Sequence, residues 1–83
     1  MTEKQEMHLL EYYRNVSLML HIARKDMMYA IEKNDEEALK LAMRKEAERC
    51  TEKYGFESAL KILGYSIEPI DDHFHYELKE ETK

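Results

Sequence analysis

The longest uninterrupted pattern in the sequence covers residues 3–33, which contain neither Gly nor Pro. Apolar side chains recur in this segment at alternating spacings of four and three residues, and this spacing places them in one stripe along a helix. The stripe consists of Leu9, Tyr13, Val16, Leu20, Ala23, Met27 and Ala30. The whole chain holds only two Gly and one Pro, a composition that favours long helices over many strands and turns. The sequence therefore predicts one long helix over residues 3–33.

A second helix is predicted over residues 35–54. We expect Asn34 to cap its first turn, with Glu37 three residues later as its partner in a capping box. Because the connection is so short, the two helices must run antiparallel. The apolar stripe predicted for the second helix consists of Leu39, Met43, Ala47, Cys50 and Tyr54.

Gly55 is expected to end the second helix, because Gly commonly stands just past a helix end. If the helix continued, the apolar residues after Gly55 would lie roughly opposite the stripe before it. The sequence therefore predicts a short third helix over residues 56–63, which stops at Gly64. The alternative is one continuous helix that meets different partners along its length.

The spacing of apolar residues changes from helical to alternating near the C-terminus, which indicates β-strands. Pro69 restricts the first strand to an edge position or to its own end. A two-stranded hairpin is not stable alone, so we expect its apolar side to dock on the helices. The alternating runs are Tyr65 and Ile67 in the first strand, and Phe74, Tyr76 and Leu78 in the second.

These elements add up to a mainly α fold. It consists of an antiparallel two-helix hairpin, a short third helix and a C-terminal β-hairpin, with assembly as a dimeric helical bundle as an option. Eighty-three residues make one small domain. We expect this domain to span residues 1–79 and to be followed by a flexible tail over residues 80–83.

The long helix is apolar on a second side. Met7, Leu18, Ile22 and Tyr29 fall within about 60° of one another on a helical wheel, roughly opposite the main stripe. A helix in a two-helix hairpin needs only one buried face, and exposed apolar patches tend to mark contact surfaces. Three coverings are open: the third helix and β-hairpin of the same chain, a second copy, or a different protein. These four residues are the candidates for contact with a partner or a dimer mate.

The formal net charge of −5 argues against direct nucleic-acid binding, because a negative chain does not attract phosphate backbones over its whole surface. An acidic regulator or inhibitor that binds the basic surface of a nucleic-acid-binding partner is one alternative function. The longest apolar run, residues 16–23, is far short of the roughly 20 residues that span a bilayer, so no membrane partner is expected. A single cysteine, Cys50, fits a reducing compartment, and we expect a cytoplasmic protein.

Side chains that can bind metals are concentrated near the C-terminus. In an extended strand, Asp71, His73, His75 and Glu77 would share one face, and carboxylates and imidazoles are ligands for zinc or nickel. An ordinary solvated strand face explains the same pattern. The sequence therefore assigns no metal and no cofactor, and Asp71, His73 and His75 stay as candidates for a second alternative, a metal-responsive protein.

The remaining polar residues do not indicate catalysis. Cys50 lies on a predicted apolar stripe, where cysteine behaves as a small hydrophobic residue. The chain is therefore not expected to be an enzyme. The expected function is that of a small, non-catalytic protein–protein interaction module, which self-associates as a homodimer through its first helix or binds another protein.

Overall fold

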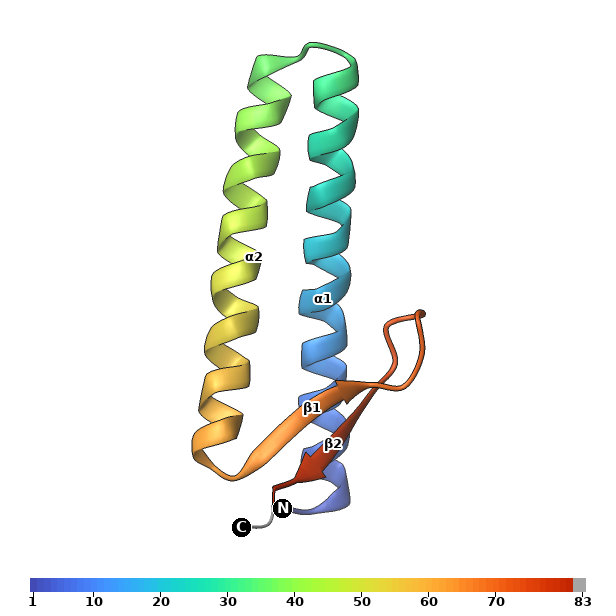
Figure 1. Ribbon diagram of the computed structural model, residues 1–83, viewed down its shortest axis with the longest axis vertical. Coiled ribbons are helices and arrows are strands. Elements are labelled where there is room, and N and C mark those ends of the chain that lie inside the picture. Colours follow the sequence, from blue (N-terminus) through green and yellow to red (C-terminus); the bar gives the residue numbers. More distant parts are fainter. Residues whose placement is uncertain (82–83) are drawn as a thin grey trace.

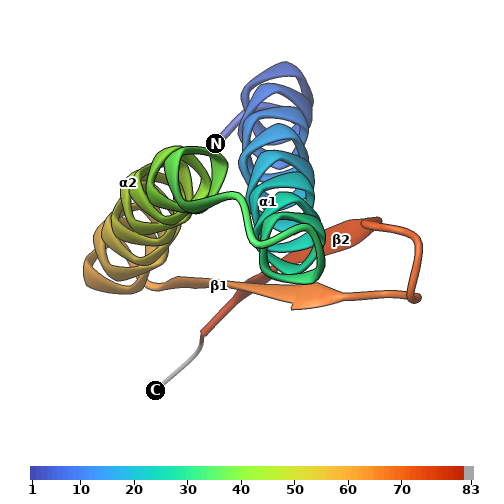
Figure 2. The same cartoon turned by 90° about the horizontal axis from the view of Figure 1, so that it is seen from above.

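The computed structural model describes residues 1–81, which form two long helices and one β-hairpin (Figure 1). Helix α1 (Glu3–Glu32) and helix α2 (Glu36–Ile62) lie antiparallel, and strands β1 (Tyr65–Pro69) and β2 (Tyr76–Glu80) pair as a two-stranded antiparallel sheet. The sheet crosses one face of the helix pair near the N-terminus of α1 and the C-terminus of α2 (Figures 1 and 2). The mainly helical fold with a helical hairpin and a β-hairpin is confirmed.

Helix α1 forms where the sequence predicts it. Thr2 caps its first turn: the Thr2 hydroxyl accepts from the backbone amide of Gln5, and the Gln5 side chain accepts from the backbone amide of Thr2. This reciprocal pair satisfies two amides that have no partner within the helix. The predicted stripe faces α2 and the sheet, with Leu9 and Met27 half-buried and five members buried, namely Tyr13, Val16, Leu20, Ala23 and Ala30.

The turn between the helices differs from its prediction. Asn34 is not the cap of α2, because it adopts φ 53 and ends α1. The Asn34 amide donates to the Ile31 carbonyl, and the Asp35 amide donates to the Ala30 carbonyl. This pattern is a Schellman motif, in which one residue adopts a left-handed conformation. Asn adopts that conformation more readily than most other non-Gly residues. Asp35 caps α2 instead, because its side chain accepts from the Ala38 amide at 3.1 Å.

The prediction of a break at Gly55 and of a third helix over residues 56–63 is wrong. Helix α2 runs without interruption from Glu36 to Ile62. The side of α2 that faces α1 follows spacings of three and four residues straight through Gly55, and it includes charged residues as well as apolar ones. Its members are Leu39, Ala42, Glu46, Arg49, Lys53, Phe56 and Leu60, all buried or half-buried.

The predicted stripe of α2 is therefore also wrong in most of its members. Met43, Ala47 and Tyr54 are exposed, whereas Leu39 and Cys50 are half-buried. Glu46, Arg49 and Lys53 take their places because long charged side chains cover apolar surface with their stems while their charged ends reach water. The Lys53 ammonium, for example, lies 5.5 Å from the centre of the Tyr13 ring.

The two glycines are expected to respond in opposite directions to alanine. Gly55 is an exposed interior residue of α2, and an added Cβ would meet nothing within 4 Å, so Gly55→Ala should raise the free energy of unfolding by about 0.5–1 kcal/mol. Gly64 follows the end of α2 with φ +88, so Gly64→Ala should lower it by about 1 kcal/mol. Urea unfolding followed by circular dichroism measures both changes. A loss of stability in Gly55→Ala would contradict the continuous helix.

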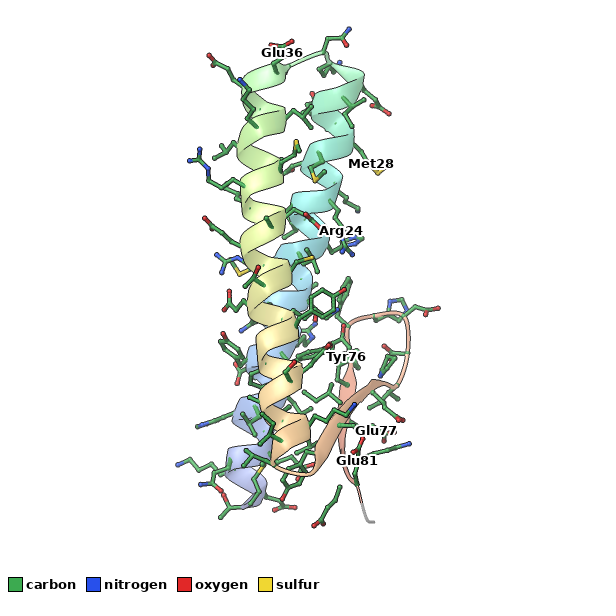
Figure 3. The ribbon with its side chains drawn as sticks, turned by 60° about the vertical axis from the view of Figure 1, so that its left-hand side comes forward. Arg24, Met28, Glu36, Tyr76, Glu77 and Glu81 are labelled. Carbon is green, nitrogen blue, oxygen red and sulfur yellow. The ribbon has the colours of Figure 1, made fainter. Side chains whose placement is uncertain are left out.

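The β-hairpin is amphipathic. Ile67 lies opposite Leu78 on the half-buried side of the sheet, where Tyr76 is also half-buried. The outer side carries Lys79, whose ammonium lies 2.7 Å from a carboxylate oxygen of Glu68. Figure 3 shows Tyr76 between the sheet and the helices. This arrangement follows from the alternation of side chains along a strand, and the predicted hairpin is confirmed.

The second strand begins later than predicted. Phe74 is not part of β2 because it adopts φ 62 in the turn, where its ring packs 5.2 Å from that of His21 on α1. At its other end, β2 includes Glu80, and the backbone amide of Glu81 donates to Gly64 at 2.7 Å. The last two residues of the expected tail lie outside the described residues.

Candidate protein interaction surface

The helix pair has two faces that differ in what covers them. We call the side on which the sheet packs the hairpin face, and the opposite side the open face (Figure 2). On α1, His21 contacts the hairpin turn, whereas Asp26 comes five residues later and therefore points about 140° away from it. Asp26 lines the groove between the helices on the open face.

Two hollows form this groove, one after the other along the helix pair. The hollow nearer the α1–α2 turn has a floor of small side chains, Ala30, Ala38 and Ala42, with Tyr29 and Leu41 at its rims. The charged residues Asp26, Lys33, Asp35 and Lys45 also line this hollow. The next hollow is lined by Met19, Ile22 and Ala23 from α1 and by Lys45, Glu48 and Arg49 from α2. Asp26 and Lys45 line both hollows, so they lie at the same level on opposite sides of the groove.

Large apolar side chains on this face are exposed. Ile22 is 55% exposed, Tyr29 64% and Leu41 51%. Large residues of this kind are usually buried, and a set of them along one groove is typical of a surface that contacts another molecule.

The four predicted contact residues are not all on this face. Ile22 and Tyr29 line the groove, whereas Leu18 is half-buried in the chain itself and Met7 is exposed near the N-terminus of α1. Sequence reasoning missed Leu41 as a groove residue. Its signal is the spacing of Ala38, Leu41, Lys45 and Glu48, which repeats the three-four-three spacing of Met19, Ile22, Asp26 and Tyr29 on α1.

The charged residues of the open face differ in whether they form ion pairs. Toward the N-terminus of α1, Arg49 pairs with Glu52 at 2.7 Å, and the Tyr12 hydroxyl donates to Glu52 at 2.5 Å. These hydrogen bonds, the one from Tyr12 first, lower the pKa of Glu52. By contrast, Asp26 and Lys45 make no ion pair with each other or with any other residue in the described part of the chain, residues 1–81.

The hairpin face is covered only in part. Beyond the sheet, Arg24 and Met28 project from α1 on the side of the hairpin (Figure 3). Arg24 lies 3.5 Å from Glu46, and the Cys50 thiol donates to Glu46 at 3.3 Å. Burial and the hydrogen bond to Glu46 raise the pKa of the Cys50 thiol, and these surroundings disfavour the nucleophilic thiolate.

The candidate metal ligands do not share a strand face, because residues 70–75 form a bent turn. Asp71 accepts from the His73 amide at 2.8 Å and lies 2.8 Å from the His75 imidazole, and these contacts, His75 first, lower the pKa of Asp71. Within residues 1–81, no three His, Cys, Asp or Glu side chains converge in a way that could hold a metal ion. The predicted Asp71, His73 and His75 set is therefore an Asp–His pair that stabilises a turn.

Comparison with protein-family models, with curated proteins and with solved structures finds no match for this chain. No helix in residues 1–81 combines the length and the apolar character needed to cross a membrane.

The accessible surface of the chain is large for its mass. It amounts to 6606 Å², whereas a compact monomer of 10.0 kDa exposes about 5,200 Å². The excess, about 1,400 Å², arises because a single layer of two helices measures 49 Å in its longest dimension and carries a sheet on part of one face only. A standard protein–protein interface buries about 800 Å² on each partner, so the chain exposes enough additional surface to form one.

Proposed function

We propose that this chain is a non-catalytic protein–protein interaction module that self-associates through α1. The single observation that carries the proposal is the open face, where Ile22, Tyr29 and Leu41 line a continuous groove and remain exposed. The excess of accessible surface supports the same conclusion. A second copy is the simplest partner, because most soluble oligomers are symmetric homo-oligomers.

Ile22→Asp is expected to weaken self-association at least tenfold, because it places a charge among the apolar residues of the groove. Met28→Asp is the matched control, since Met28 is a similarly exposed apolar residue of α1 on the hairpin side. Sedimentation velocity across a series of chain concentrations measures the dissociation constant of each variant.

The wild-type chain should be dimeric at high concentration, and Met28→Asp should match it. A wild-type chain that stays monomeric across the whole series would overturn the proposal of self-association. An equal loss in Ile22→Asp and Met28→Asp would show that the open face is not the contact surface.

A further inference from the structure

The open face also indicates how a second copy would be oriented on it. We infer that two chains stack open face on open face about a two-fold axis parallel to the helices, so that α1 of each copy lies over α2 of the other. This inference rests on the proposed self-association. It specifies which residues of the two copies meet.

The charges of the groove that form no ion pair support this orientation. Asp26 on α1 and Lys45 on α2 lie at the same level along the groove. A two-fold axis along the groove places every residue of α1 opposite the residue of α2 at the same level in the second copy. Asp26 of each chain therefore faces Lys45 of the other, and the dimer contains this opposite-charge pair twice.

The apolar residues of the groove support the same orientation. Tyr29 and Leu41 lie at the same end of the groove, on either side of the alanine floor. In the inferred arrangement, Tyr29 of one copy meets Leu41 of the other, and both have a hollow floored by Ala30, Ala38 and Ala42 to fill. Apolar groups of the two partners that pack closely on one another are typical of stable interfaces.

The competing arrangement turns the second copy end over end, about an axis perpendicular to the helices. With the two chains fully overlapped, α2 lies on α2, Leu41 of one copy lies near the level of Glu57 in the other, and Asp26 no longer faces Lys45. That orientation loses both the Asp26–Lys45 pairs and the contact between Tyr29 and Leu41. The levels of the groove residues therefore favour the axis parallel to the helices.

The position of the β-hairpins leaves room for this orientation. The sheet packs on the hairpin face, so stacking through the open faces leaves both β-hairpins on the outside of the assembly (Figure 2). The result is a four-helix bundle, in which neighbouring helices belonging to different chains run antiparallel. The excess surface of about 1,400 Å² per chain exceeds the roughly 800 Å² that each partner of a standard interface buries.

Charge exchange tests this orientation. Asp26→Lys places two lysines opposite each other in the homodimer and Lys45→Asp places two aspartates there, so each variant alone should dimerise at least tenfold more weakly than the wild type. When the two variants are mixed, the lysine introduced into one chain faces the aspartate introduced into the other. The unchanged Asp26 and Lys45 face each other at the second contact. The mixture should therefore form a heterodimer of about wild-type affinity.

Sedimentation velocity on each variant and on the equimolar mixture gives the three dissociation constants, and circular dichroism verifies that each variant keeps its helices. Lys25→Asp is the matched control: it changes the net charge as Lys45→Asp does, but its exposed side chain lines neither hollow, and it should dimerise like the wild type.

The outcomes separate the two proposals. A wild-type dimer whose affinity survives both single changes, or a mixture that fails to form heterodimers, would overturn the inferred orientation and leave self-association standing. A monomeric wild-type chain would overturn both, and the groove would then belong to a different protein.

Discussion

Leu60→Ala is expected to lower the free energy of unfolding by about 3 kcal/mol, because it removes a buried side chain and leaves a cavity in the core. Leu60 is 4% exposed, and it lies near the end of α2. A domain of this size has only a few kcal/mol of stability from its core, so the change removes a large fraction of it.

Ile62→Ala provides the control for Leu60→Ala. Ile62 is 86% exposed and lies only two residues away in the same helix, so its truncation should change the free energy of unfolding by less than about 0.5 kcal/mol. Urea unfolding at one fixed chain concentration measures both values, because self-association makes apparent stability depend on concentration. Equal effects of the two changes would show that the last turns of α2 do not pack on the rest of the chain.

The position of Leu60 also explains why sequence reasoning succeeded for α1 and failed for α2. The stripe of α1 is made of apolar residues throughout, so its spacing alone predicts both the helix and its buried side. In α2 the buried side passes through Glu46, Arg49 and Lys53 before it reaches Leu60. A search for apolar residues skips these positions, and the stripe then shifts and ends at Gly55.

Their tertiary partners explain why charged residues occupy the middle of α2. Glu46 lies beside Arg24, and Lys53 lies over the Tyr13 ring, so both side chains have partners on α1. The sequence alone does not pair residues that are about 20–40 positions apart. The sequence alone also does not decide whether the helix continues through Gly55, because Gly is tolerated inside a helix wherever its missing side chain would point to solvent.

The candidate contact surface was predictable to the same extent as its helices. Ile22 and Tyr29, which the pattern of α1 predicts as contact residues, both line the groove. Leu41 was missed because the register assigned to α2 was wrong. Leu18 was expected to contact a partner, and it is half-buried within the chain. A helical wheel of one helix does not show which of its residues are buried by elements distant in sequence.

The centre of the small core is Tyr13, where α1, α2 and the sheet meet. Its ring makes an edge-to-face contact with Tyr76 of β2 at 4.7 Å between centres and lies 5.8 Å from Phe56 of α2. Its hydroxyl donates to the carboxylate of Glu57. Contacts from α1 to both α2 and β2 make this residue the main link between the helix pair and the β-hairpin.

Tyr13→Ala is therefore expected to lower the free energy of unfolding by about 4 kcal/mol and to detach the β-hairpin. Tyr13→Phe keeps the ring and removes only the hydrogen bond to Glu57, so it should cost about 1 kcal/mol. Urea unfolding measures both, and hydrogen exchange at the β2 amides reports the detached hairpin. If Tyr13→Ala and Tyr13→Phe cost the same, the ring does not link the sheet to the helices.

The two Tyr13 variants should also differ from the wild type in alkaline solution. Burial, followed by the hydrogen bond to Glu57, raises the pKa of Tyr13 above its ordinary value of 10.0. A raised pKa contributes stability that is fully present below pH 10.0 and is lost as the pH rises toward the folded-state pKa, because the unfolded chain releases the Tyr13 proton first.

The wild type should therefore lose stability above about pH 10 more steeply than Tyr13→Phe, which has no hydroxyl to ionise there. Urea unfolding at a series of alkaline pH values gives the two slopes. Identical slopes for the wild type and Tyr13→Phe would mean that the Tyr13 hydroxyl is not held protonated by the folded chain.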